Sequence, residues 1–101
     1  MTDKDALISN LKPYVQMQEL IANLTKTKMV TTITEILSSK FTNNQEEVPH
    51  LISTIMYVIK IRPSQISTIA VFIKKLLDYN NEYYQLTEFR MQLIKMIINI
   101  L

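Results

Sequence analysis

The chain of 101 residues has no glycine, no cysteine and no tryptophan, and it has a single histidine. Phosphate-binding loops, dinucleotide-binding turns and EF-hand calcium loops all need glycine where the backbone turns sharply or approaches the ligand. Without cysteine there are no disulfides, no thiolate catalysis and no cysteine-containing zinc site. These motif classes are excluded, so we expect no cofactor and no metal. The expected location is a reducing intracellular compartment, the cytoplasm.

The composition is typical of a folded domain, with 48% hydrophobic and 20% charged residues. The net charge of +2 comes from 11 basic and 9 acidic residues scattered along the chain, which argues against a nucleic-acid partner. The polar, acidic N-terminus does not resemble a secretory signal. No uncharged apolar run approaches the roughly 20 residues that span a bilayer, so we expect no membrane partner.

Apolar residues recur every three or four positions, which is the period of one face of an α-helix. This pattern predicts five helical units, at about residues 3–24, 29–41, 48–61, 63–77 and 83–101. The apolar stripe of the first unit consists of Leu7, Ile8, Leu11, Tyr14, Val15, Leu20, Ile21 and Leu24, and that of the second consists of Met29, Val30, Ile33, Ile36, Leu37 and Phe41. The third stripe consists of Val48, Leu51, Ile52, Ile55, Met56 and Ile59, and the fourth of Ile66, Ile69, Ala70, Ile73, Leu76 and Leu77. The fifth consists of Tyr83, Tyr84, Leu86, Phe89, Leu93, Ile94, Ile97, Ile100 and Leu101. We therefore predict an all-α fold of about five antiparallel helices, packed as an irregular bundle or a short solenoid of helical hairpins.

Proline and asparagine mark the expected helix ends. Pro13 lacks a backbone N–H and its ring clashes with the preceding turn, so we expect a kink or a break near it. Pro63 pushes Arg62 out of the helical region, which ends one helix and begins the next. Asn80 and Asn81 tolerate the left-handed conformation of a helix stop, and here they replace the glycine that usually provides it.

The segment 91–101 is apolar on almost every side, with Gln92, Lys95 and Asn99 as its only interruptions. A helix of this kind is buried on more than one side. We expect it either to be the central helix of the bundle or to be covered by further residues of a longer protein. Homo-oligomerisation through this C-terminal helix is another way to cover it. Residues 1–101 are accordingly interpreted as a single helical domain, the N-terminal part of a longer protein.

The candidate catalytic residues are few. His50 and Glu47 lie close together at the start of the third predicted helix and form the only acid–base pair worth considering. A histidine at such a position is usually a solvated surface residue, and Glu47 is explained by its favourable interaction with the helix dipole. The serines have no glycine-flanked elbow and no recognisable triad. We predict no catalytic residue and no enzyme activity.

A tyrosine cluster surrounds the expected turn at Asn80 and Asn81. Tyrosine and arginine are the residues that most often anchor protein interfaces, and a turn displays them. A tyrosine here could instead staple the entry of the last helix from inside. Together with the apolar end of the last helix, this cluster gives the predicted protein-binding residues, which are Tyr79, Tyr83, Tyr84, Arg90, Ile97, Ile100 and Leu101.

One part of the chain resembles the helical N-terminal region that precedes ankyrin arrays in large families of protist proteins. There, an apolar helix is followed by Ile-Arg-Pro and then by another helix. The residues that carry the resemblance are Leu51-Ile52-Ser53-Thr54-Ile55, Ile61-Arg62-Pro63-Ser64-Gln65-Ile66 and Phe72-Ile73-Lys74-Lys75-Leu76-Leu77. The resemblance implies a helical module at the start of a scaffold protein, with ankyrin repeats after Leu101. The chain itself has no ankyrin signature such as Thr-Pro-Leu-His.

The predicted function is therefore a non-catalytic protein–protein interaction or scaffold module, N-terminal to an ankyrin-repeat region. The alternative is a small helical nucleic-acid-binding domain, in which residues 63–77 would act as a recognition helix. Its basic surface would consist of Lys26, Lys28, Lys40, Arg62, Lys74 and Lys75. A salt-dependent shift of labelled DNA or RNA would favour that alternative.

Overall fold

The computed structural model describes the backbone of residues 3–100 and the side chains of residues 11–99. Within residues 3–100 the chain is helical and has no strand. In chain order the elements are α1 (Asp3–Ala22), α2 (Met29–Leu37), α3 (Lys40–Asn43), α4 (Val48–Ile61), the 3₁₀ turn η1 (Pro63–Gln65), α5 (Ile66–Tyr79), the π-helical turn η2 (Asn80–Tyr84) and α6 (Thr87–Ile100). The predicted all-α fold is confirmed.

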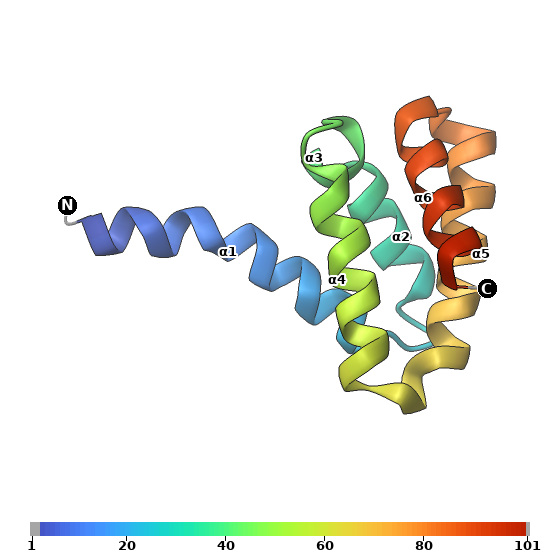
Figure 1. Cartoon of the computed structure of the whole chain (residues 1–101), viewed down its shortest axis with the longest axis horizontal. Coiled ribbons are helices and arrows are strands. Elements are labelled where there is room, and N and C mark those ends of the chain that lie inside the picture. Colours follow the sequence, from blue (N-terminus) through green and yellow to red (C-terminus); the bar gives the residue numbers. More distant parts are fainter. Residues whose placement is uncertain (1–2, 101) are drawn as a thin grey trace.

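Helices α4, α5 and α6 run alternately down and up the bundle (Figure 1). Helix α2 packs against α5, α6 packs against α4, and the short α3 contacts both α2 and α4. The second half of α1 lies against α4, whereas its first half projects away from the bundle (Figure 1). We call residues 3–12 of α1 the arm. The bundle agrees with the sequence-based prediction, but the projecting arm was not predicted.

The hydrophobic core runs through every helix of the bundle. Its largest fully buried side chains are Phe72, Phe89, Ile21, Ile33, Leu37, Leu51, Ile55, Ile69, Leu76, Leu93, Val48 and Val58. Several residues of the predicted stripes are exposed instead, namely Leu11, Val15, Val30, Met56, Ile66, Ala70 and Tyr83. Five apolar residues outside the predicted stripes are buried, namely Met17, Ala22, Val58, Phe72 and Met96. Leu7, Ile8, Ile100 and Leu101 lie outside the residues whose side chains are described.

The stripe errors have a geometric cause, which α5 illustrates. Its buried line is Ile69, Phe72 and Leu76, and these residues have the same three-and-four spacing as the predicted stripe. The line is rotated toward Phe72, so Ile66, at the start of the helix, lies outside the contact with α2. Spacing alone identifies a helix, but the position of its neighbours decides which of several apolar lines is buried.

The break that was one of the two alternatives predicted near Pro13 is absent, because helix α1 continues through Pro13; its ribbon bends as it reaches the bundle (Figure 1). One predicted helix was wrong as a single unit. The unit predicted at 29–41 is divided into α2 and α3, because Ser39 leaves the helical region and caps α3. The Ser39 hydroxyl donates to the carbonyl oxygen of Ile36 at 2.6 Å and accepts from the backbone N–H of Phe41 at 3.3 Å.

Helix α2 ends without glycine because side chains of α3 bind its last carbonyl groups. The buried hydroxyl of Thr42 lies 2.9 Å from the carbonyl oxygen of Ile36 and 3.1 Å from that of Leu37. The side-chain amide of Asn43 also donates to Leu37, at 3.0 Å. The carbonyl groups at a helix end need partners when they are shielded from water. Here a threonine and an asparagine provide them.

Helix α5 ends at Tyr79, next to the predicted stop at Asn80 and Asn81, but the left-handed conformation predicted for these asparagines was wrong. Asn80 is helical, with φ −63° and ψ −44°, and the chain stays helical through η2. The left-handed residue is Gln85, with φ 55° and ψ 40°. Asn80 is fully buried, and its side-chain amide forms two hydrogen bonds with the backbone of Leu86, one donated at 3.1 Å and one accepted at 3.0 Å. Asparagine is therefore used for the hydrogen-bonding capacity of its side chain, not for its backbone.

The prediction that the segment 91–101 is buried on more than one side was also wrong for the residues whose side chains are described. Helix α6 buries one line, formed by Phe89, Leu93 and Met96. Met91 and Ile98, on its other side, have exposed fractions of 48% and 65%. The helix is therefore an outer helix of the bundle that packs on α4 through one face.

Candidate interaction surface

The predicted tyrosine cluster has two inner members and one outer member. Tyr79 and Tyr84 are partly buried and pack against the core. The Tyr84 hydroxyl oxygen lies 3.4 Å from the hydroxyl oxygen of Ser38, which ties η2 to the end of α2. Tyr83 has an exposed fraction of 67%, and its ring meets that of Tyr79 edge to face, with the centroids 5.7 Å apart. Of the three tyrosines, only Tyr83 is presented to solvent.

The other predicted interface residues are less exposed or are not described. Arg90 is exposed on the first turns of α6, whereas Ile97 is partly buried and packs against the core. The side chains of Ile100 and Leu101 lie outside the described residues. The carboxylate of Glu82 beside Tyr83 raises the pKa of that phenol above its ordinary value of 10.0, so Tyr83 stays a neutral hydrogen-bonding group at physiological pH.

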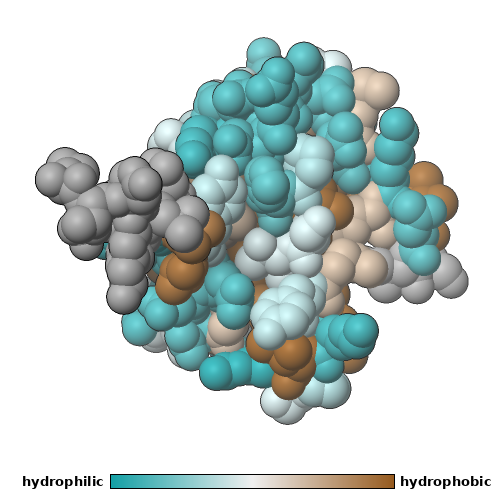
Figure 2. Space-filling view, turned by 60° about the vertical axis from the view of Figure 1, so that its left-hand side comes forward, coloured by the Kyte–Doolittle hydropathy of each residue, from teal (hydrophilic) through white to brown (hydrophobic). Residues whose placement is uncertain are grey.

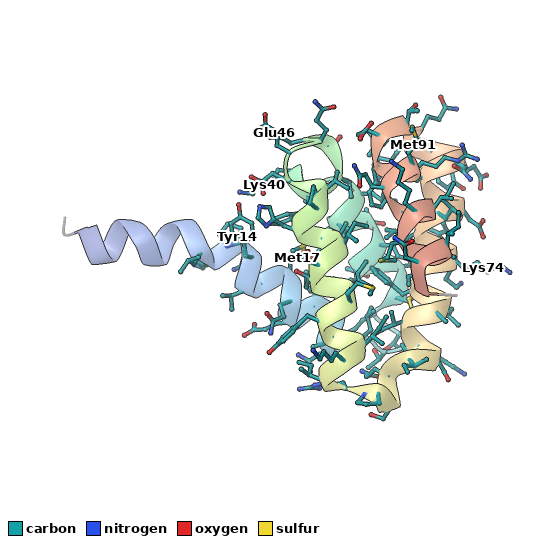
Figure 3. The ribbon with its side chains drawn as sticks, in the orientation of Figure 1. Tyr14, Met17, Lys40, Glu46, Lys74 and Met91 are labelled. Carbon is teal, nitrogen blue, oxygen red and sulfur yellow. The ribbon has the colours of Figure 1, made fainter. Side chains whose placement is uncertain are left out.

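A polar and aromatic cluster holds α1 where it enters the bundle. The Tyr14 hydroxyl donates to Glu47 Oε2 at 2.9 Å, and the Lys40 ammonium lies 4.0 Å from Glu47 Oε1. The same ammonium lies 4.8 Å from the centre of the Tyr14 ring, and Figure 3 shows the two side chains facing each other at this junction. The rings of Phe41 and His50 meet Tyr14 edge to face, with centroid distances of 5.2 Å and 5.1 Å. We call these five residues the Tyr14 junction.

The Tyr14 junction gives a structural role to both residues of the candidate acid–base pair, Glu47 and His50. One oxygen of Glu47 accepts from Tyr14 and the other faces Lys40, so its hydrogen-bonding capacity is used to hold α1. His50 is exposed and contacts Tyr14 through its ring. Its backbone N–H donates to the carbonyl oxygen of Glu47 at 3.1 Å, so the bond between the two residues does not involve the imidazole or the carboxylate. Glu46, its other acidic neighbour in sequence, is exposed. The arrangement orients α1 against the bundle.

A groove of about 420 Å³ lies between α1 and α4, on the side where the arm leaves the bundle. We call it the α1–α4 groove. Its lining residues are Leu11, Tyr14, Gln18, His50, Ser53, Thr54 and Tyr57. Leu11 and Tyr57 have exposed fractions of 50% and 48%, and neither a carboxylate nor an ammonium group lines the groove. Figure 2, which views the side that carries the arm, shows hydrophobic surface beside the arm and along the lower edge of the molecule.

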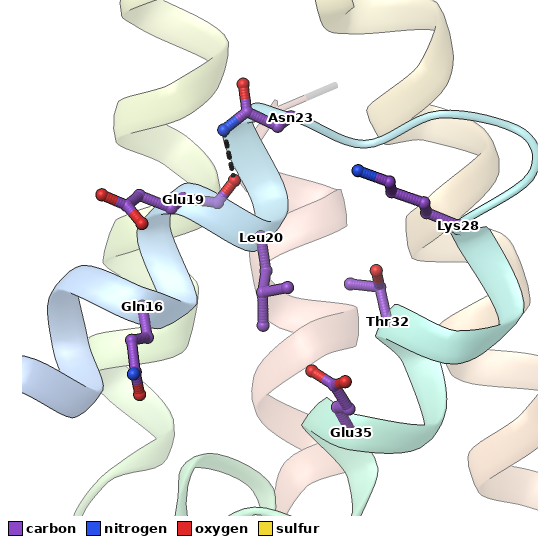
Figure 4. A pocket seen from close by; sticks show the side chains of 7 residues that line it. All are labelled: Gln16, Glu19, Leu20, Asn23, Lys28, Thr32 and Glu35. Carbon is purple, nitrogen blue, oxygen red and sulfur yellow. Dashed lines mark hydrogen bonds between the residues drawn. The ribbon is translucent and has the colours of Figure 1, made fainter.

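A second groove, of about 460 Å³, lies on the opposite side of α1, between α1 and α2. Figure 4 shows Gln16, Glu19 and Leu20 on α1, Thr32 and Glu35 on α2, and Lys28 immediately before α2. This groove contains two carboxylates and one ammonium group, and it is open to solvent. Sequence reasoning found neither groove, because both depend on the angle at which α1 meets the bundle. The only signal in the sequence was the apolar pair Leu11 and Val15 on the two sides of Pro13.

Within the described residues, no group of three or more His, Asp or Glu side chains is placed to hold a metal ion. None of the described helices combines the length and the apolar character needed to cross a membrane. A comparison with protein-family models, with curated proteins and with solved structures finds no match to this chain.

Proposed function

We propose that this chain is a non-catalytic protein-interaction or scaffold module that presents α1 and the α1–α4 groove to a partner protein. The observation that carries this proposal is the exposed apolar surface of α1. Leu11 and Val15 have exposed fractions of 50% and 52%, although the same helix buries Met17, Ile21 and Ala22 in the core. Tyr57 extends this surface onto α4. An exposed apolar surface next to a groove is a common feature of protein-binding sites.

The chemistry of the groove indicates how a protein would bind. A groove between two helices, with no carboxylate or ammonium group among its lining residues, suits the apolar face of a third helix. The neutral hydroxyl and amide groups of Gln18, Ser53 and Thr54 can form hydrogen bonds at the edge of such a contact. The position of the module before an ankyrin-repeat region, in an intracellular scaffold, is part of the proposal and is supported by the resemblance of residues 51–77.

The alternative function, nucleic-acid binding, has weaker support. Lys74 and Lys75 are exposed on α5, but Asp78 follows Lys74 by one helical turn and is exposed as well. A nucleic-acid surface usually combines many basic groups, because each neutralised phosphate adds to the affinity. Two lysines beside an aspartate provide little of this attraction.

An affinity-capture experiment with three tagged proteins tests the proposal. The wild type is compared with Tyr57→Asp, which places a charge in the α1–α4 groove, and with Val71→Asp, a control on the exposed side of α5. We expect a protein that binds the wild type and the control but not Tyr57→Asp. Equal capture by all three, or no captured protein, would contradict the proposal. Salt-dependent binding of labelled DNA or RNA at low ionic strength would support the alternative instead.

A further inference from the structure

The chain exposes more surface than a compact protein of its size. A folded monomer of 11.8 kDa exposes about 5,900 Å², whereas this chain exposes 6779 Å². The excess is about 900 Å², and a protein–protein interface of ordinary size buries about 800 Å² on each partner. The radius of gyration, 13.8 Å, also exceeds the value of about 12.7 Å for a compact domain of 101 residues. The backbone of the first half of α1 projects from the bundle (Figure 1), and a projection of this kind raises the radius of gyration.

The exposed face of α1 has a pattern that is complementary to itself. Lys12 comes three residues before Val15 and Glu19 comes four residues after it, so all three lie on one face of the helix. All three side chains are exposed. A face with a lysine at one end, a valine in the middle and a glutamate at the other end matches an identical face that runs in the opposite direction.

We propose that α1 binds a second copy of this chain, with the two α1 helices antiparallel about a two-fold axis at Val15. This inference rests on the proposed function and names its partner. With a rise of about 1.5 Å per residue, Lys12 and Glu19 lie at nearly equal distances on the two sides of the axis. Each Lys12 therefore faces Glu19 of the other copy, and the two valines meet at the axis. The symmetric contact contains two ion pairs and no unpaired charge from these residues.

The α1–α4 groove completes the contact on the other flank of the helix. A two-fold rotation of this kind brings each flank of α1 against the same flank of the second copy. Leu11 and Gln18 lie on the groove flank, whereas Glu19 lines the groove between α1 and α2. Leu11 of one copy thus lies at the level of Gln18 of the other, where Tyr57 of α4 is exposed. Because the groove carries no carboxylate or ammonium group, a second copy meets no repulsion there.

Charge reversal tests this arrangement in solution. Light scattering or sedimentation should show a dimer of the wild-type chain that dissociates on dilution. In Lys12→Glu alone, and in Glu19→Lys alone, both ion pairs become like-charge pairs, so the dissociation constant should rise about tenfold or more. In an equimolar mixture of these two variants, every contact between unlike chains again joins opposite charges, so the dimer should return. Both side chains are exposed, so the melting curves of the single variants should match that of the wild type.

Three outcomes would overturn the inference. The first is a single-chain mass even at about 1 mM protein. The second is a dimer whose stability is unchanged in Lys12→Glu and Glu19→Lys, which would place the interface elsewhere, for example on α6. The third is a mixture of the two variants that remains monomeric. The proposed function is judged separately by the capture experiment with Tyr57→Asp, so a monomeric chain that retains a groove-dependent partner would refute self-association alone.

Discussion

Replacing Asn80 by leucine should destabilise the fold by about 2–3 kcal/mol. The Asn80 side chain is fully buried, and its amide is bonded to both the N–H and the carbonyl group of Leu86, at 3.0 Å and 3.1 Å. Leucine has a similar size and cannot form either bond. Two backbone groups are then left without partners, and each costs about 1–3 kcal/mol when it is shielded from water. Because both bonds are only partly buried, we take the lower part of this range.

A loss of this size is easily measured. Small domains are stable by about 5–15 kcal/mol, and each kcal/mol corresponds to about 4–8 °C in the melting temperature of a chain of this length. Thermal unfolding followed by circular dichroism should therefore show a fall of about 8–24 °C for Asn80→Leu. Asn81→Leu is the matched control, because Asn81 lies next to Asn80 and is exposed. This substitution should change the free energy of unfolding by less than about 0.5 kcal/mol.

Asn80→Asp separates the hydrogen bonds from simple packing. At neutral pH the buried carboxylate loses the bond to the Leu86 carbonyl group and lies in a poorly solvated position, so its pKa should be raised above that of an unfolded aspartate. A raised folded-state pKa means that stability is retained below the unfolded pKa of about 3.9 and is lost as the pH rises. The difference in free energy of unfolding between Asn80→Asp and the wild type should therefore be smaller at pH 4 than at pH 7. Equal differences at both pH values, or an Asn80→Leu protein as stable as wild type, would refute this account.

Three other substitutions test separate parts of the fold. Thr42→Val keeps the shape of the side chain but removes the hydroxyl that binds the last carbonyl groups of α2, so urea unfolding should show a loss of about 1–2 kcal/mol. Tyr14→Phe should cost about 1 kcal/mol, and in a double-mutant cycle its effect should disappear in a Glu47→Ala background; additive losses would show that the 2.9 Å bond contributes nothing. Ile69→Asp should abolish cooperative unfolding because Ile69 is 1% exposed, whereas Val71→Asp, on the exposed side of the same helix, should leave the melting curve almost unchanged.

The sequence predicted the elements of this fold well because helix periodicity and proline act locally. The start of α4 near Pro49, its end before Pro63 and the all-α class depend on residues within a few positions of each boundary. The turn after Asn80 was mispredicted because a buried asparagine and a left-handed one have the same sequence signature. Only the distance to Leu86, six residues later, distinguishes them.

The predicted binding residues show the same limit. Sequence reasoning selected the tyrosines near η2, but Tyr79 and Tyr84 mostly support the helix junction, and Tyr83 alone is well exposed. It assigned Leu11 and Val15 to the core because they continue the stripe of a helix whose second half is packed. Whether the first half of such a helix is packed depends on its angle at Pro13 and on contacts with α3 and α4, which lie more than 20 residues away in the chain.

The Tyr14 junction connects the stability of the bundle with the proposed use of α1. If α1 were hinged freely at the bundle, binding would have to fix the direction of the arm, and the lost freedom would subtract from the affinity. The bond from Tyr14 to Glu47 and the rings of Phe41 and His50 fix this direction before a partner arrives. Tyr14→Phe should therefore weaken the proposed dimer by lowering the fraction of chains with a correctly oriented arm, even though the Tyr14 hydroxyl is bonded within its own chain. A dimer as tight as wild type in that variant would show that the arm is oriented by Met17 and Ile21 in the core.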